Sequence, residues 1–238
     1  YLKKSDEIQK RTIPIVKTLL TQISEKKSIK KEINSATTKI TLRYGLIDMN
    51  RTITGYLKGN YNDSADKFET INGDSISTWN NFNWNSKHYC TSIFIPSEFE
   101  TKIKSDVKNS IITDSKIHTI THVLVNASKI LTKSESNDID AYYENGIIHL
   151  FDNTSDGYNG CSKMIYENFE EIMDTCFDLI NECDCPVDPK QKKSVSDGEE
   201  WGGCPKCTFT TNYCQTKNKK LSKNEALEFF SIFKREIK

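Results

Sequence analysis

A cluster of cysteines near the carboxy end of the chain limits the possible folds more than any other segment. Five of the eight cysteines lie within residues 183–214, and two of them form the turn Gly203-Cys204-Pro205-Lys206-Cys207. The polar segment 186–202 between the cysteine groups shows no periodicity, so it cannot build a core and its ends need another anchor. Four thiolates around Zn²⁺ would supply that anchor. The sequence therefore predicts a structural zinc site, which has no open position for a reacting water.

Five cysteines compete for the four positions of such a site. The preferred ligands are Cys185, Cys204, Cys207 and Cys214, with Cys183 as the substitute for one of them. Free thiols and two disulfides are the alternatives, and a Cys-x-x-Cys turn can also be a redox pair. No thioredoxin-like βαβ pattern surrounds this turn, which argues against a redox role. The three remaining cysteines are expected to be ordinary buried thiols: Cys90, Cys161 and Cys176.

Cysteine usage also bears on the compartment. An even number of cysteines and four Asn-x-Ser/Thr sequons would suit a secreted protein. The crowding of five cysteines into one segment favours a reduced intracellular compartment instead. The longest apolar runs, such as residues 147–151, are far too short to span a membrane, so no membrane partner is expected. The chain begins at Tyr1 without an initiator Met, and we expect it to be cut from something longer.

Charge is unevenly distributed along the chain, although the net charge is zero. Residues 1–43 carry 11 basic and 4 acidic side chains, residues 204–238 carry 8 and 3, and the middle carries 14 and 26. Basic ends can contact nucleic acid phosphates, and lysines can equally well solvate helix faces. Four lysines beside the cysteines form the candidate nucleic-acid-binding surface: Lys217, Lys219, Lys220 and Lys223.

The amino-terminal half shows the alternation of strands. Residues 1–36 form a basic segment with weak helical patterning. From Thr38 apolar and polar residues alternate, and a second alternating run covers Thr52–Leu57, which predicts a β-hairpin or meander. Residues 58–86 are predicted to form a long loop with aromatic anchors. A strand is expected at Tyr89–Ile95.

The carboxy-terminal half is mainly helical. Helices are predicted from Ser97 into the run before Ile111, over Lys116–Leu131 and over Cys161–Glu182. A hairpin is predicted from Ile139–Tyr143 and Ile147–Phe151, which Asn145-Gly146 joins. A last helix is predicted from Ser222, with Glu225 completing a capping box. Strands and helices lie in separate blocks, so the expected class is α+β, a β-hairpin or meander followed by helices with a four-cysteine zinc knot near the C-terminus. The zinc knot covers residues 183–214.

Three further patterns carry weaker signals. His118 and His122 lie one turn apart, as in zinc proteases, but Thr119 stands where that motif needs a glutamate, so packing histidines are favoured. The glycine turn 152–160 offers amides to an anion but lacks a phosphate-loop sequence, and a plain strand-to-helix turn is favoured. Four aromatic residues can stack on bases but are expected to anchor the long loop: Trp79, Phe82, Trp84 and Tyr89.

Several of these segments occur in an order that resembles the carboxy-terminal zinc-binding domain of MrfA-like helicases. The strand leading into Ile53-Thr54-Gly55-Tyr56 resembles the hairpin beyond the motor of that family, and residues 117–124 look like its His-rich helix. Residues 148–152 and the glycine turn are similar to its strand and turn. The cysteine signature is the most specific match: Cys183-Asp184-Cys185, residues 203–207, Cys214, Asn218 and Leu221-Ser222-Lys223.

The resemblance covers roughly residues 39–238 and implies a zinc-binding domain appended to superfamily 2 DEAD/DEAH-type DNA helicases, whose members act in DNA repair and whose related domains occur in anti-phage defence. It implies Zn²⁺ as a structural cofactor, with Cys185, Cys204, Cys207 and Cys214 as ligands. The segment 186–202 is longer than in the family, so the choice between Cys183 and Cys185 stays open. Implied partners are single-stranded DNA and helicase motor domains, in cis or in trans. The implied location is a prokaryotic cytoplasm.

Two functions follow from these features. The first is a non-catalytic zinc-binding accessory domain or subunit of an ATP-dependent DNA helicase, formed by residues 37–238 after the basic segment 1–36. The alternative is a protein-interaction scaffold that docks a helicase or defence-complex partner. No nucleotide-binding loop and no Asp-Glu-x-His box occur in the sequence, so we expect no catalytic activity of this chain itself.

Overall fold

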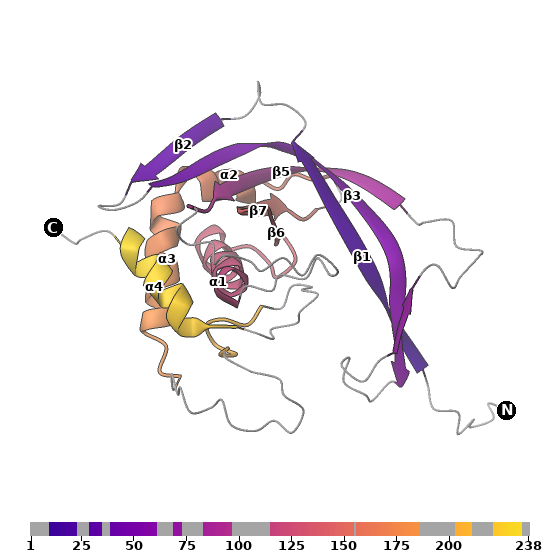
Figure 1. Cartoon of the computed structure of the whole chain (residues 1–238). Helices are drawn as coiled ribbons and strands as arrows, with labels where there is room; N and C mark the ends of the chain where they lie inside the picture. The colour runs from indigo at the N-terminus through magenta and orange to yellow at the C-terminus, as the bar shows by residue number, and fades with distance from the viewer. Residues whose placement is uncertain are drawn as a thin grey trace. The chain divides into compact units, whose positions relative to one another are not determined.

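The structure is a computed structural model of the chain. It describes residues 10–22, 29–34, 39–60, 69–72, 83–96, 115–154, 156–185, 203–210 and 221–234. The chain forms two compact units, of which the first comprises Tyr1–Ile23 and Ile47–Lys87 and the second comprises Ser24–Leu46 and His88–Lys238. Strands β3 (Lys39–Asn60) and β5 (Asn83–Phe94) each contribute residues to both units. Figure 1 shows the course of both strands.

The first unit is an antiparallel arrangement of strands. Strand β1 (Lys10–Gln22) pairs with residues 47–60 of β3, with a bulge between Ile15 and Val16, and β4 (Glu69–Asn72) pairs with residues 55–58 of β3. The weak helical pattern predicted for residues 1–36 is therefore wrong for β1, and β4 lies within the predicted long loop. Pairing with a neighbouring strand can override the local sequence preference of a segment, so weak helical patterning is a poor predictor of its structure.

The second unit contains a sheet in which β2 (Ile29–Asn34) pairs with β3, β3 neighbours β5, and β5 pairs with β7 (Ile147–Asp152). Strand β6 (Ile139–Glu144) pairs with the other side of β7. The β6–β7 hairpin predicted from Asn145-Gly146 is confirmed, because both turn residues have positive φ, 50° and 79°, as a two-residue hairpin turn requires.

Strand β3 is continuous where the sequence suggested a turn. Its buried residues are Ile40, Leu42 and Tyr44 and then Ile47 and Met49, so the alternation shifts by one position between Tyr44 and Ile47. Because of that shift, the alternation of apolar and polar residues looks like two separate strands in the sequence. The structure corrects the prediction to one 22-residue strand.

Four described helices belong to the second unit: α1 (Ser115–Thr132), α2 (Cys161–Glu167), α3 (Phe169–Asn181) and α4 (Lys223–Phe233). Helix α1 was predicted correctly. The single helix predicted over residues 161–182 is divided at Asn168, whose backbone leaves the helical region at φ −109° and ψ 28°. The helix predicted after Ser97 lies outside the described residues.

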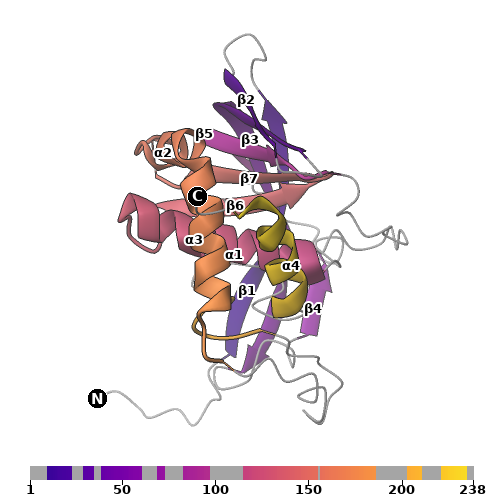
Figure 2. The same ribbon diagram turned by 90° about the vertical axis from the view of Figure 1, so that its left-hand side faces the viewer.

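The core of the second unit lies between these helices and its sheet. Helix α1 contacts α3, α4 and β6, and Figure 2 shows α4 beside α3. The apolar faces supply fully buried side chains such as Ile120, Leu124, Phe169, Ile172 and Phe230. The predicted α+β class is thereby confirmed, and no described helix is long and apolar enough to cross a membrane.

Candidate metal centre

Two short segments bring the cysteines together. Cys183 and Cys185 follow the end of α3, while Cys204 directly precedes a turn over residues 205–208 and Cys207 belongs to it. Within this turn the Thr208 hydroxyl accepts a hydrogen bond from the Cys204 amide at 2.6 Å, and the Thr208 amide donates to the Cys204 carbonyl at 3.0 Å. These bonds close the Cys-x-x-Cys turn.

Helix α1 anchors the cysteine turn. The His122 ring donates through Nδ1 to the Thr208 carbonyl at 3.0 Å, and the Asn126 amide donates to the Phe209 carbonyl at 2.8 Å. Gly203 is required here for space, because a Cβ at this position would lie 2.6 Å from Leu221 Cδ1 and 2.7 Å from the Phe209 ring. A side chain at position 203 would therefore require the Leu221 and Phe209 side chains to move.

Four sulfur atoms converge at this place. The Sγ atoms of Cys183, Cys185, Cys204 and Cys207 all lie within 4.8 Å of one another. The Cys183–Cys204 distance is 3.7 Å and the Cys185–Cys207 distance is 3.9 Å. Cys204 and Cys207 are buried, whereas Cys183 and Cys185 are partly exposed. The four thiols are free.

The spacing matches the demands of zinc. Four thiolates at about 2.3 Å from a tetrahedral ion lie about 3.8 Å from one another. The two distances above, 3.7 and 3.9 Å, are close to that edge length. The donor set and its spacing therefore fit a structural Zn²⁺ ion, as the sequence predicted. Four protein ligands fill the tetrahedron and leave no site for a substrate or water.

The membership of this cluster differs from the preferred set of the sequence. Cys183, which was the substitute, lies in it, while Cys214 lies outside the described residues. The other three cysteines are buried at separate positions. Cys176 donates to the Val123 carbonyl, Cys90 lies beside His149 on the sheet, and Cys161 begins α2.

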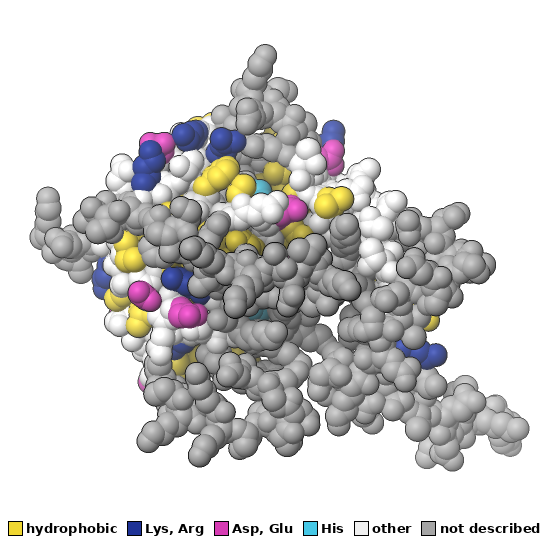
Figure 3. Space-filling view, in the orientation of Figure 1, with side chains coloured by type: hydrophobic (Ala, Val, Ile, Leu, Met, Phe, Trp, Pro, Cys, Tyr) yellow, Lys and Arg dark blue, Asp and Glu magenta, His cyan; other side chains and the backbone are white. Residues whose placement is uncertain are grey.

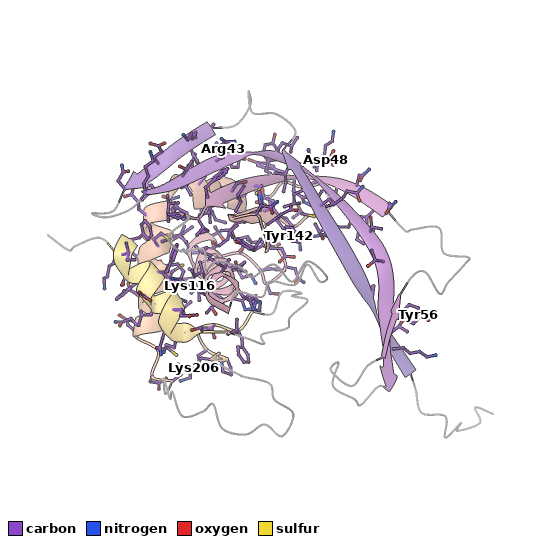
Figure 4. The ribbon with its side chains drawn as sticks, in the orientation of Figure 1. Arg43, Asp48, Tyr56, Lys116, Tyr142 and Lys206 are labelled. Carbon is purple, nitrogen blue, oxygen red and sulfur yellow. The ribbon has the colours of Figure 1, made fainter. Side chains whose placement is uncertain are left out.

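Two lysines lie beside the cysteine cluster and make different contacts with it. The Lys223 ammonium donates to Cys185 Sγ at 2.9 Å and to the Cys183 carbonyl at 3.2 Å, and Lys223 is only 7% exposed. Lys206, labelled in Figure 4, has an exposed side chain whose Nζ lies 2.8 Å from Asp184 Oδ1. Its backbone amide donates to Cys204 Sγ at 3.3 Å. Of the predicted nucleic-acid-binding lysines, Lys223 is thus turned toward the cysteines, and Lys217, Lys219 and Lys220 lie outside the described residues.

The ionisation of the cluster reflects burial and crowding. Burial raises the pKa of the Cys185 and Cys207 thiols. Burial acts in the same direction on Cys204, but hydrogen bonds from Cys185 and from the Lys206 amide outweigh it and lower the pKa of Cys204 to about 7. Burial acts to lower the pKa of Lys223, yet its hydrogen bond to Cys185 prevails and raises it. Four thiolates this close repel one another, and a divalent cation relieves that repulsion.

The two histidines of α1 pack in the interior of the protein. His118 and His122 are buried on α1 with ring centroids 4.3 Å apart. Burial, reinforced by His118, lowers the pKa of His122 to about 3, so its ring is neutral. Because Nδ1 donates its proton to the Thr208 carbonyl, Nε2 carries the lone pair. The interpretation preferred from the sequence, packing histidines, agrees with this arrangement.

In the described part of the glycine turn and at the start of α2, a carboxylate of the chain itself occupies amides that could bind an anion. The buried Asp152 carboxylate already accepts hydrogen bonds from the amides of Asn159 and Gly160, each at 3.1 Å, and of Ser162 at 2.6 Å. Gly157 and Gly160 have positive φ, 71° and 84°, which the turn requires. The predicted plain strand-to-helix turn is thus what the structure contains, and no local pattern indicated that Asp152 occupies these amides.

The described aromatic residues are divided between packing and exposure. Tyr89 stacks on Tyr44 with centroids 5.8 Å apart and contacts Tyr158 edge-on at 5.1 Å. Tyr89 is 37% exposed, and Trp84 is 40% exposed. Trp79 and Phe82 lie outside the described residues. Tyr89 therefore belongs to a packed aromatic group of the second unit.

Residues 120–208 match the family model of the MrfA Zn-binding domain. The resemblance predicted from the sequence is therefore confirmed over these residues, which contain all four clustered cysteines. No curated protein matches the sequence.

Among solved structures, the DUF1998 helicase MrfA bound to DNA is similar in fold. It has a TM-score of 0.54 and 16% identity, over 94% of this chain and 26% of that chain. A second structure of DUF1998 helicase MrfA has a TM-score of 0.45 and 15% identity, over 91% of this chain and 24% of that chain. The chain thus spans about a quarter of the length of the helicase that it matches.

Proposed function

We propose that this chain is a non-catalytic zinc-binding accessory domain or subunit of an ATP-dependent DNA helicase, and that it contacts single-stranded DNA. The observation that carries the proposal is the coincidence of the MrfA Zn-binding match over residues 120–208 with four sulfurs spaced for tetrahedral zinc. The motor acts in cis or in trans, and the setting is DNA repair or anti-phage defence in a prokaryotic cytoplasm, where thiols stay reduced.

The proposed ligands are Cys183, Cys185, Cys204 and Cys207. Their mutual spacing supports this set, and the family match ends at residue 208, before Cys214. A zinc ion held by these thiolates would tie the end of α3 to the turn that α1 anchors. Its role is to hold the fold, because a closed tetrathiolate offers no position for a reacting group.

The proposed DNA-contacting side chains are Lys217, Lys219 and Lys220. They lie in a basic stretch that follows the cysteine turn in sequence, and Lys223 is excluded because it is buried against the cluster. The basic side chains that gather near β2, dark blue in Figure 3, are less suitable, since Lys30 and Lys39 both pair with Glu32. A lysine that is paired with a carboxylate must first lose that partner before it can neutralise a phosphate.

The test measures binding of a fluorescent single-stranded oligonucleotide by the zinc-loaded full chain at several salt concentrations. We expect the logarithm of the binding constant to fall linearly with the logarithm of the salt concentration. Changing Lys217, Lys219 and Lys220 to Glu should reduce affinity and lower the slope by about 0.7 for each phosphate that the chain no longer neutralises.

A matched control carries the same change of charge at exposed lysines paired with glutamate: Lys30, Lys39 and Lys163. It should bind nearly as well as the wild-type chain. Absence of binding, binding indifferent to salt, or an equal loss in the control would contradict DNA contact at residues 217–220.

A second candidate function is docking of a protein partner, and one surface feature favours it. A groove of about 430 Å³ lies where α1, α3 and the cysteine segments meet, with Ile130 and Leu179 beside acidic residues; its lining includes Asp178, Glu182, Asp184 and Lys206. Carboxylates next to apolar side chains suit a basic peptide better than a phosphate backbone. Retained partner binding by the Lys-to-Glu variant, together with absent DNA binding, would favour this alternative.

A further inference from the structure

Lys223 has an unusual environment for a lysine. It is the first residue of α4 and is 7% exposed, although lysine is rarely buried unless its charge is paired. Its ammonium contacts the Cys185 sulfur at 2.9 Å and the Cys183 carbonyl at 3.2 Å. Both acceptors belong to the cysteine segment after α3, so Lys223 faces the cluster and is shielded from solvent.

The charge of the cluster explains why a cation belongs there. Four thiolates carry four negative charges and Zn²⁺ carries two positive ones, so a tetrathiolate zinc centre retains a net charge of minus two. Burial of such a charge is costly unless cations or hydrogen-bond donors compensate it. The Lys206 amide supplies one donor, to Cys204, while the Lys206 ammonium faces Asp184.

We propose that Lys223 is a positioning residue of the zinc centre, whose ammonium compensates the charge of the thiolates and orients Cys185 through a hydrogen bond to its sulfur. This inference rests on the proposed zinc binding and goes beyond it, since it assigns a metal-retaining role to a side chain that is not a ligand. Partners that hydrogen-bond to metal ligands typically change metal affinity by about 10- to 100-fold.

The position of Lys223 also connects the metal centre to α4. The preceding residue, Ser222, donates its amide to the Thr119 hydroxyl on α1 at 2.7 Å, and Leu221 packs close to Gly203. The start of α4 is therefore held by α1 on one side and by the cysteine segment on the other. Zinc occupancy and the docking of α4 are thus expected to be coupled through this lysine.

The experiment compares zinc retention by the full chain and by its Lys223→Met, Lys223→Gln and Lys223→Arg variants, through transfer of zinc to a chromophoric chelator. We expect about a 10- to 100-fold loss of apparent affinity for Lys223→Met. Lys223→Gln should fall between Met and wild type, and Lys223→Arg should restore most of the retention because it keeps the charge. Lys206→Met is the matched control, since it removes a cation next to the cluster whose ammonium contacts a carboxylate and is exposed.

A spectroscopic readout separates this role from a loss of packing. In the Co²⁺-substituted chain, a hydrogen bond to a thiolate lowers the energy of the sulfur electrons and raises the energy of the sulfur-to-metal charge-transfer band. Lys223→Met should therefore move this band to lower energy, and Lys206→Met should leave it in place. Far-UV circular dichroism of each zinc-loaded variant reports whether α4 is still folded.

Wild-type retention and an unchanged band in Lys223→Met would overturn the inference, and so would an equal loss in Lys206→Met. A wild-type chain without zinc would instead remove the proposed function together with the inference. A wild-type chain that holds zinc but does not bind DNA would remove the DNA proposal alone.

Discussion

The cysteines near the metal centre differ in burial, and substitution of each one is expected to have a different effect on zinc binding. Cys207 is fully buried in the cluster, whereas Cys183 is partly exposed at its edge. Removal of one thiolate from a four-ligand site opens it to water and weakens binding, while removal of a bystander does not. Substitution of single cysteines can therefore decide which four of the five candidate cysteines bind the metal.

The proposed ligand set predicts different outcomes for Cys183→Ser and Cys214→Ser. Cys183→Ser should lose most of its bound zinc, because a hydroxyl is a poor replacement for a thiolate in this geometry. Cys214→Ser should keep one zinc per chain. Metal analysis after gel filtration in the presence of a weak chelator measures both, with Cys161→Ser as a control far along the chain from the cluster. The reverse pattern would restore the set preferred from the sequence.

His149 should make stability depend on pH. It is partly buried on β7 with Nδ1 2.9 Å from the Ser92 hydroxyl, and burial lowers its pKa to about 4. Above pH 6.5 the ring is neutral in both states and the pH has no effect through it. As the pH falls from about 6.5 toward 4, only the unfolded chain gains a proton, so stability decreases, by about 2–3 kcal/mol at most.

The measurement is urea unfolding at several pH values, with zinc content determined at each one. His149→Asn should reduce the dependence between pH 6.5 and 4 but not abolish it, because burial also lowers the pKa of His122. An exposed-site control, Lys163→Gln, should leave it unchanged. A variant whose stability falls as steeply as that of the wild type would assign the acid sensitivity to another group.

At the scale of elements, the connection between β7 and α2 depends on one carboxylate. Asp152 ends β7, is fully buried, and receives three amide hydrogen bonds from the turn and the first residues of α2. Its own carbonyl lies 2.8 Å from His88 Nδ1 on β5. The side chain therefore fixes the direction in which the chain leaves the sheet and begins the helix.

Asp152→Ala should destabilise the chain by about 3 kcal/mol or more, because three buried amides lose a charged acceptor. The nearby Asp156→Ala should cost less than about 0.5 kcal/mol, since Asp156 is exposed and its contact with the Tyr158 amide is long, at 3.5 Å. Chemical denaturation of both variants measures the difference. Equal effects would mean that the turn is held by its glycines alone.

Helix boundaries show the same dependence on contacts outside the element. The sequence predicts a capping box at Ser222 and Glu225, but the Ser222 side chain makes no capping hydrogen bond. Its amide instead donates to Thr119 on α1. The start of α4 is thus set by packing against α1 and by Lys223, and local capping chemistry contributes less than the sequence suggests.

At the scale of the whole molecule, zinc is expected to hold segments that have few apolar residues of their own. The turn over residues 205–208 is attached through its cysteines and through hydrogen bonds to α1. Binding of structural zinc contributes on the order of 10 kcal/mol in small zinc domains. The second unit has a large helical core as well, so loss of the metal should affect its parts unequally.

Removal of zinc by a strong chelator should lower the helical circular dichroism signal and the melting temperature. Hydrogen exchange should accelerate most at residues 203–210 and in α4, and least in α1 and the β6–β7 hairpin, which pack in the core. Addition of Zn²⁺ should reverse these changes and addition of Mg²⁺ should not, because thiolates bind Zn²⁺ well and Mg²⁺ prefers oxygen ligands. Unchanged exchange in α4 would show that its docking is independent of the metal.

The sequence alone determined the features that depend on a few neighbouring residues: the zinc-binding character of the cysteines, α1, the Asn-Gly hairpin and the α+β class. Periodicity, turn chemistry and Cys-x-x-Cys spacing are local, so they can be read without knowing what packs against them. The tertiary structure decided which four sulfurs converge, that Lys223 faces them, and that Asp152 occupies the amides of the glycine turn. The first two depend on residues far apart in the chain, whose proximity follows from burial of the common core, and the third depends on how the tertiary structure folds the turn back onto the end of β7.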